Sequence, residues 1–287
     1  MALHDLLHRF RRNTVRPSPE LHRRIRERLA QLATPCARLV LEDSDPAPTD
    51  SNLGCRPYLP AGESWPTRDG EPLTFLAQIN FSQVPPLPGF PVTGLLQWFV
   101  PDDDTYGLYS GTRTEADPYG AHLRWWADIG APGAEPATPD RAHVPEYYPV
   151  ERTGRIRCEP GLSLPRWQEL PEAVRGERIW VELAAAHRGT RGDAGLAYDE
   201  YAAGEDSPLP EHVPGSKVGG HARFVQDDPR TYPPYPPLGS PGGQLLVMLD
   251  SAETGGWADS GIGVLFGDPS ALARGDVRSV TYSWDCG

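Results

Sequence analysis

The sequence predicts an α+β fold that is strand-rich, with mainly antiparallel sheets, two similar tandem halves and an N-terminal helical arm. Three observations support this fold class. From residue 53 onward, short apolar runs alternate with Gly- and Pro-rich turns, which is typical of strands. The order of these runs recurs about 167 residues later. The first 33 residues instead place apolar side chains at helical spacing.

The clearest element is a hairpin around residues 243–267. Gln244–Leu249 is a short apolar run bounded by Gly243 and Asp250, which favours a buried strand. A second run, Ile262–Phe266, follows after a Gly-rich loop. We expect the two strands to be antiparallel, because so short a connection cannot make a parallel crossover.

The arm carries two amphipathic patterns separated near Pro17. The apolar positions are Leu3, Leu6, Leu7 and Phe10 in the first pattern, and Leu21, Ile25, Leu29 and Leu32 in the second. Ser18 and Pro19 are placed to start the second helix. We expect these helices either to cap the main fold or to dock on another protein.

The remaining patterns divide the chain into this arm, residues 1–33, and one domain, residues 34–287. The domain consists of a first half, about 50–160, a connector, 161–216, and a second half, 217–287. Further strands are expected at 37–41, 53–60, 72–80, 94–100, 121–126, 154–158, 222–226 and 277–282, with a tight turn at Gly219-Gly220 before 222–226. A helix is expected at 171–187, and exposed loops are expected at 188–215 and at the Pro-rich 231–241. That Pro-rich loop is either a spacer or, through Tyr232 and Tyr235, a peptide-binding face.

The internal repeat is the most informative feature of the chain. Three blocks align in order: Val218–Val225 with Leu53–Pro60, Leu245–Asp250 with Phe75–Asn80, and Gly261–Gly267 with Gly94–Val100. The offsets are 165, 170 and 167 residues. Spacing this constant predicts a duplicated unit.

Charge limits the partners. The chain of 287 residues has a net charge of -12, so its body should repel nucleic acid. The first 28 residues hold eight Arg against Asp5, Glu20 and Glu27. This basic segment fits an acidic partner, an anionic surface or the acidic body of its own fold.

Cysteine spacing and hydropathy bear on the compartment. Cys36, Cys55, Cys158 and Cys286 form no CxxC pair, which argues against a zinc ribbon and against a disulfide scaffold. No signal peptide is visible, and no apolar run approaches the roughly 20 residues of a membrane span. We therefore expect a cytoplasmic protein with no metal, no cofactor and no membrane span.

Motifs spread over residues 50–287 resemble the YwqG-like family, a bacterial domain of unknown function. They are Gly54 with Pro57–Pro60, Trp65-Pro66, Phe75–Asn80, Leu87–Pro91, Gly94–Val100, Asp104–Gly107, Gly219-Gly220, Phe224–Gln226, Asp228–Arg230, Leu245–Asp250, Trp257–Gly261 and Trp284–Cys286. The resemblance implies an α+β domain with a large, mainly antiparallel sheet. Some relatives are encoded near secreted toxins, which implies an immunity role. The chain departs from the family pattern at Cys55, Ala222, Met248 and Ala258.

The candidate binding residues lie in the matched motifs. They are Trp65, Gln78, His221, Gln226, Asp250, Trp257, Asp259 and Ser260. As aromatic residues at loop tips, Trp65 and Trp257 either anchor a partner or plug the ends of the sheet. Asp250 and Asp259 either face a ligand or cap strand ends.

These observations favour a non-catalytic binding protein, which binds another protein and is immunity-like toward a basic toxin. No complete catalytic constellation is present, so no catalytic residue is predicted. One alternative is an enzyme or a small-ligand or metal binder that uses a cleft between the halves, with Gln78, His221, Asp250, Asp259 and Ser260. The other is a scaffold subunit that docks through residues 1–33.

Overall fold

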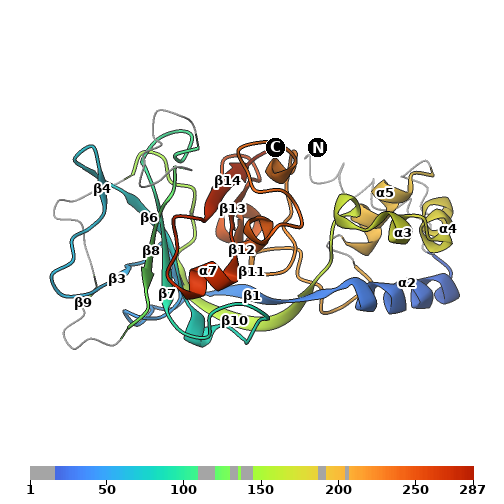
Figure 1. Ribbon diagram of the computed structural model, residues 1–287, viewed down its shortest axis with the longest axis horizontal. Coiled ribbons are helices and arrows are strands. Elements are labelled where there is room, and N and C mark those ends of the chain that lie inside the picture. Colours follow the sequence, from blue (N-terminus) through green and yellow to red (C-terminus); the bar gives the residue numbers. More distant parts are fainter. Residues whose placement is uncertain (1–16, 109–119, 130–134, 137–144, 187–191, 204–206) are drawn as a thin grey trace, which may run out of the picture. The chain divides into compact units, whose positions relative to one another are not determined.

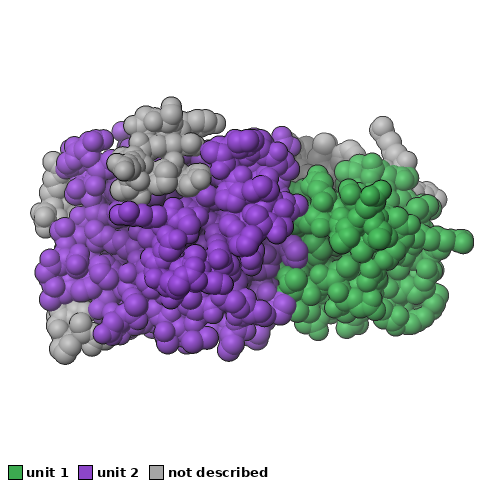
Figure 2. All heavy atoms as spheres, in the orientation of Figure 1, with its two compact units in different colours: residues 1–34, 162–214 green, residues 35–161, 215–287 purple. Residues whose placement is uncertain are grey.

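The structure is a computed structural model that describes residues 17–108, 120–129, 135–136, 145–186, 192–203 and 207–287. The chain forms two compact units (Figure 2). Unit 1 contains residues 1–34 and 162–214, and unit 2 contains residues 35–161 and 215–287. The arm and most of the connector therefore belong to one unit.

Unit 1 is helical. The second predicted helix is present as α2, Pro19–Leu32, and the Ser18 side chain accepts a hydrogen bond from the Leu21 amide at its start. Its apolar face, Leu21, Ile25 and Leu29, is buried in the core of this unit. This face is therefore not free to dock a partner, and the expected first helix lies outside the described residues.

Two predictions for this unit were wrong. The helix expected at 171–187 is divided into α3, Glu172–Arg175, and α4, Arg178–Ala186. The first of these helices ends at Gly176, which is its C-cap. The loop expected at 188–215 contains α5, Ala194–Ala197, and a π-helical turn η5, Tyr198–Ala202. Tyr198 is fully buried there. One helical turn is too short to show the periodicity that identifies a helix.

Unit 2 is built on one ten-stranded sheet in the order β14-β13-β12-β11-β1-β10-β2-β6-β7-β8 (Figure 1). The strands are β1 Thr34–Glu42, β2 Asn52–Leu53, β6 Thr74–Asn80, β7 Leu95–Val100, β8 His122–Trp126, β10 Gly154–Ser163, β11 Lys217–Val218, β12 Leu245–Asp250, β13 Ile262–Phe266 and β14 Thr281–Asp285. The sheet is curled and largely antiparallel, so the strand-rich α+β class is confirmed.

Short elements complete the description. Two small sheets pair β3, Tyr58–Leu59, with β9, Glu135–Pro136, and β4, Thr67–Arg68, with β5, Glu71–Pro72. Short helices are η2 Phe81–Gln83, η3 Trp167–Glu169, η6 Pro229–Thr231, η7 Pro241–Gly243, α6 Ser251–Thr254 and α7 Pro269–Ala273. Among the described residues, no helix has the length and apolar character needed to cross a membrane.

The strand order reads alike in both directions from the central β1 and β10. Outward on one side lie β2, β6, β7 and β8, and outward on the other lie β11, β12, β13 and β14. Asn52 pairs with Gln78 on the first side, and Lys217 pairs with Met248 on the second. These pairs are related by the sequence offsets of 165 and 170 residues.

The agreement extends to an irregularity and to the strand ends. Each half has a register shift at the same point, between Phe75 and Ala77 in β6 and between Leu245 and Val247 in β12. The backbone amide of Asn80 donates a hydrogen bond to the Ser51 hydroxyl at 2.9 Å. In the second half the Asp250 amide donates to the Ser216 hydroxyl, also at 2.9 Å.

The two halves share one core on the inner face of the sheet. Trp98 of the first half lies 5.8 Å from Trp257 and 5.6 Å from Tyr282 of the second, between ring centroids. A Cβ at Gly263 would lie 2.3 Å from the Trp257 ring. Glycine is therefore required where this indole crosses β13.

The strand expected at 222–226 was wrong, because in this part of the chain only Lys217–Val218 joins the sheet. The turn expected at Gly219-Gly220 is present. Gly219 and Gly220 follow with φ of 71° and 77°, a left-handed conformation that turns the chain away from the ladder. Lys217 is the chain's only lysine. It is 2% exposed.

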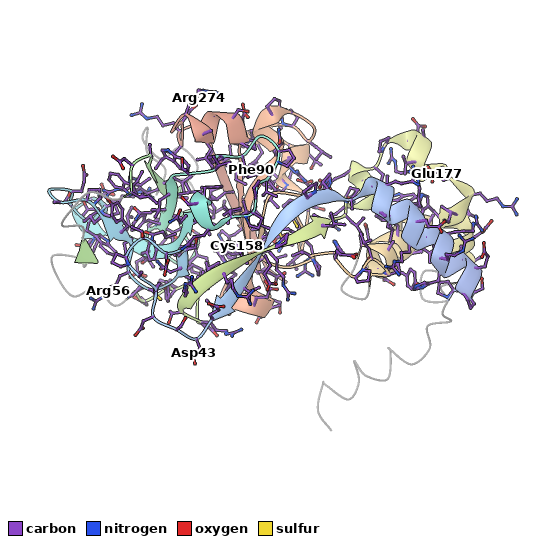
Figure 3. The ribbon with its side chains drawn as sticks, turned by 90° about the horizontal axis from the view of Figure 1, so that it is seen from below. Asp43, Arg56, Phe90, Cys158, Glu177 and Arg274 are labelled. Atoms are coloured by element: carbon purple, nitrogen blue, oxygen red, sulfur yellow. The ribbon has the colours of Figure 1, made fainter. Side chains whose placement is uncertain are left out.

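All four cysteines are free. Burial raises the pKa of Cys158, which lies on β10 (Figure 3), to about 12. Burial also raises the pKa of Cys36 to about 11. These thiols are therefore protonated and unreactive at neutral pH.

Candidate binding site

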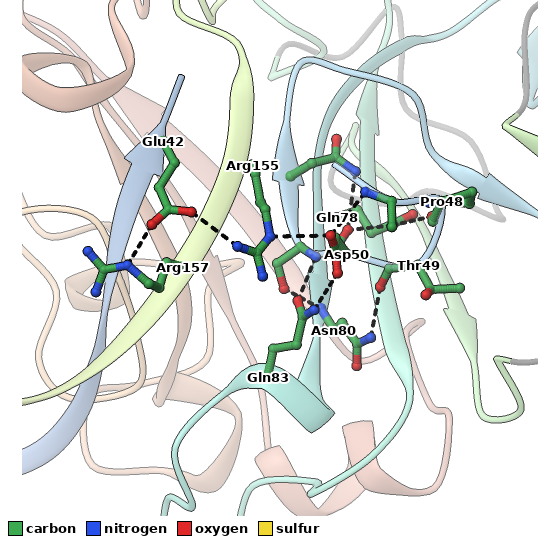
Figure 4. A network of polar contacts seen from close by, with 12 residues as sticks. Glu42, Pro48, Thr49, Asp50, Gln78, Asn80, Gln83, Arg155 and Arg157 are labelled. Carbon is green, nitrogen blue, oxygen red and sulfur yellow. Dashed lines mark hydrogen bonds and ion pairs between the residues drawn. The ribbon is translucent and has the colours of Figure 1, made fainter. Parts of the chain in front are cut away.

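Gln78 is fully buried at the centre of a polar network (Figure 4). Its Oε1 accepts from the Tyr58 amide at 2.7 Å and from Gln97 Nε2 at 2.9 Å. Its Nε2 donates to the carbonyls of Pro48 and Asp50, at 3.0 and 2.8 Å. Every hydrogen-bonding atom of this side chain is used within the fold, so Gln78 is structural here.

Around Gln78 the same network ties the loop after β1 to its neighbours (Figure 4). The Asp50 carboxylate accepts from Gln83 Nε2 at 2.6 Å and from Arg155 Nε at 3.2 Å. Arg155 also reaches Glu42, which pairs with Arg157 at 2.6 Å. Hydrogen bonding to Arg157 lowers the pKa of Glu42. The network holds the scaffold.

Asp250 is 2% exposed and is also structural. Its Oδ1 accepts from the Ala252 amide at 3.0 Å, which caps α6, and its Oδ2 pairs with Arg223. Asp259 and Ser260 are exposed in the turn that follows. Ser260 has a φ of 54°, and the Asp259 carbonyl accepts from the Gly287 amide at 2.9 Å.

The two tryptophans face inward to different degrees. Trp65 is half-buried, donates from Nε1 to the Leu73 carbonyl at 2.9 Å and lies edge-on to Phe99. Trp257 is fully buried. The interpretation of Trp257 as an exposed partner anchor was therefore wrong, because its ring fills the space between the two halves.

The residues expected to share a cleft do not gather. Gln78 lies on β6 of the first half, whereas Asp250 ends β12 of the second. His221 is half-buried beyond the Gly219-Gly220 turn. Gln226 is exposed and donates to the Cys286 carbonyl at 2.6 Å. Of the predicted residues, only Gln226 lines the cavity of about 300 Å³ found in unit 2.

This cavity lies on the face of β13 and β14 that points away from the shared core. Its apolar and aromatic walls include Phe224, Tyr232, Tyr235, Ile262 and Val264. The cavity also borders Trp284, whose indole packs on Tyr106 and Trp257 of the shared core. Its polar atoms come from Gln226, Asp227, Ser283 and Asp285. Ile262 pairs with Asp285 and Val264 with Ser283, which places these four side chains on one face.

Two side chains, Asp285 and Arg230, anchor residues 224–235, the segment that covers the cavity. Asp285 Oδ2 accepts from the amides of Val225 and Gln226, at 2.8 and 2.7 Å. Arg230 is 5% exposed, pairs with Asp228 at 2.7 Å and donates to the Gly243 carbonyl at 3.0 Å. Side chains therefore hold this segment in place of a strand ladder.

Sequence analysis missed most of this site. Phe224, Trp284 and Asp285 lie in matched motifs but are not among the eight candidate binding residues, and Tyr232 and Tyr235 entered only through the alternative role of the Pro-rich loop. The available signal was that loop, which carries two tyrosines and follows Asp227 and Asp228. Within the described part of the chain, no group of His, Cys, Asp and Glu is arranged to hold a metal ion.

Comparison with known families gives one match. Residues 51–286 match the model of a family described as "Domain of unknown function (DUF1963)". Among curated proteins, no match was found. The matched range covers every strand of the sheet except β1, the cavity of unit 2, and residues 162–214 of unit 1.

Proposed function

This chain belongs to the DUF1963 family, and we propose that it is a non-catalytic binding protein whose partner is another protein. One observation carries the proposal: an aromatic cavity with two carboxylates opens beside exposed apolar side chains. Val225, Tyr232 and Leu238 are 40%, 49% and 38% exposed, and all lie in the segment that covers the cavity or continues it. Aromatic anchors and pockets of this kind are typical of interface hot spots.

The charge of the chain favours a basic partner. A net charge of -12 accelerates association with a positively charged protein and opposes association with nucleic acid. The YwqG-like resemblance adds the finer proposal that the partner is a toxin and that binding neutralises it. Four free cysteines support a reducing compartment such as the cytoplasm.

We also propose that the two halves of the sheet derive from one duplicated unit. The agreement between the sequence offsets and the ladder registers supports this origin, as does the shared register shift. A sequence profile of many family members, aligned with itself, should match at an offset near 167 residues. If no such self-match exists, the duplication is refuted.

Partner capture tests the binding proposal. The tagged chain is used as bait in extract from its native cell, at low and high salt. We expect one stoichiometric protein that is lost at high salt, because screening weakens charge steering, and depleted about tenfold by Tyr232→Ala. Val92→Ser is the matched control, because Val92 is 66% exposed in unit 2 but does not line the cavity. The proposal is contradicted if Tyr232→Ala captures as much of the protein as the unaltered chain, or if the unaltered chain captures no protein.

A further inference from the structure

We propose that the cavity of unit 2 takes a single arginine side chain presented by the partner protein. This inference rests on the proposed function and names the chemistry that the site recognises. The cavity of about 300 Å³ is at the small end of the range of roughly 300–1,000 Å³ for small-ligand pockets. It suits one long side chain better than a folded element.

The walls fit the guanidinium and its aliphatic stem. Phe224, Tyr232 and Tyr235 contribute aromatic surface, and Ile262 and Val264 contribute apolar surface. A cation over an aromatic ring is attracted by the negative face of the ring. Arginine is favoured over lysine, because its planar group stacks on rings and is less strongly hydrated.

The charge of the lining has the complementary sign. Asp227 and Asp285 line the cavity, and none of its described lining residues is Lys, Arg or His. Asp285 is held rigidly by two backbone amides, whereas Asp227 is exposed. Burial raises the pKa of Tyr232, and the neighbouring Tyr235 phenol and the carboxylates of Asp227, Asp228 and Asp285 raise it further. These carboxylates therefore lie near the aromatic wall.

The protein already holds a guanidinium in this way beside the cavity. Arg230 lies over the rings of Phe224 and Phe266, at 5.6 and 4.8 Å from their centroids, while its charge is paired with Asp228. This pair is internally neutral, so it does not cancel the charges of Asp227 and Asp285. Phe224 belongs both to the wall of the cavity and to this internal arginine site.

The test uses two probes of equal shape, Nα-acetyl-arginine amide and the neutral Nα-acetyl-citrulline amide. Binding to the full chain is followed by NMR through the backbone amide of Trp284 and the side-chain amide of Gln226. We expect millimolar affinity for the arginine probe and about tenfold weaker binding of the citrulline probe. The neutral urea group of citrulline cannot make the cation–π contact with the rings or the ion pair with the carboxylates. Equal binding of the two probes overturns the inference.

Variants locate the interaction. Asp227→Asn should lower the affinity for the arginine probe about threefold to tenfold, and Tyr232→Ala should have an effect of the same size. Asp259→Asn is the matched control, because Asp259 is an exposed aspartate of unit 2 that does not line the cavity. An equal effect of Asp259→Asn would overturn the inference, as would tighter binding of free choline, which would identify a small quaternary amine as the occupant.

The probe experiment and the capture experiment fail separately. If a protein partner is captured in a Tyr232-dependent manner but the arginine probe does not bind, the arginine inference falls and the binding function stands. If the probe binds but no protein is captured, the site recognises a cation and the protein-binding function falls.

Discussion

The two halves of the sheet share their registers but fill one face differently. In the first half, Gln97 and Trp126 occupy the positions that Val264 and Asp285 occupy in the second. The Trp126 indole donates to Gln97 Oε1 at 2.8 Å and lies edge-on to Tyr58. Asp285 instead binds two backbone amides beside the cavity. A short acid at the position of a large aromatic residue thus leaves room for the cavity.

A second difference concerns the acceptor at the centre of each half. Gln78 Oε1 accepts from the Tyr58 amide, and in the second half the Met248 sulfur takes this role for the Arg223 amide at 3.3 Å. A thioether is a weak acceptor compared with an amide oxygen. The polar contacts that tie down the first half are therefore weaker at this point in the second, where the covering segment is held by Asp285 and Arg230.

The largest expected effect compares the loops that join the paired strands. Trp257→Ala should reduce the free energy of unfolding by about 3–5 kcal/mol, because its ring is fully buried. Phe90→Ala, in the corresponding loop of the first half, should cost about 2 kcal/mol, because Phe90 is only half-buried. Urea unfolding measures both. Equal losses would show that burial in the shared core does not distinguish the loops.

The next prediction replaces the two central acceptors by the same residue. Gln78→Leu should cost about 3 kcal/mol or more, because it leaves two buried donors and two carbonyls without their partner. Met248→Leu should cost less than about 1.5 kcal/mol, as a volume-conserving change. The difference is read from paired urea titrations. A larger loss for Met248→Leu would reverse the ranking of the halves.

The third prediction expects no difference between the halves. Ser51→Ala and Ser216→Ala each remove a hydroxyl that accepts a 2.9 Å hydrogen bond from the backbone amide of the last residue of a strand. Both serines are buried, so each change should cost about 1–3 kcal/mol, and the two values should agree within about 0.5 kcal/mol. Thermal or urea unfolding is sufficient. A clear inequality would show that matching geometry does not imply matching energetics.

The smallest effect concerns the turn that follows β11 and its counterpart after β2. Gly220 has a φ of 77°, and Cys55 occupies the corresponding position in the first half. Gly220→Ala should cost about 1 kcal/mol, because the left-handed conformation disfavours a Cβ. Cys55→Ala should be near neutral by the same unfolding measurement. A neutral Gly220→Ala would mean that this turn relaxes freely.

The sequence predicted the long, regular elements because their patterns are local. The runs that became β6, β7, β12 and β13 are apolar and bounded by turn residues, and their constant offset matched the register of the ladders. α2 was predicted from its apolar stripe and its cap. The strand expected at 222–226 does not form, because side-chain anchors far along the chain, such as Asp285, replace the ladder there.

The candidate site was harder to predict for a related reason. A cavity depends on what is absent at a position, here a large ring where Asp285 stands, and composition does not reveal an empty volume. Trp257 was misjudged because a tryptophan among glycines suits a loop tip and an aromatic plug equally well. Gly263 makes room for its indole, and Gly261 makes room for its backbone carbonyl. Only the three-dimensional packing separates the two roles.

The buried Lys217 has a practical consequence for labelling. It is the chain's only lysine and is 2% exposed, so reagents that acylate lysine side chains should react poorly with the folded protein. Amine-directed crosslinkers should, for the same reason, fail to capture a partner at the cavity, and carboxylate-directed chemistry through Asp227 is the suitable route.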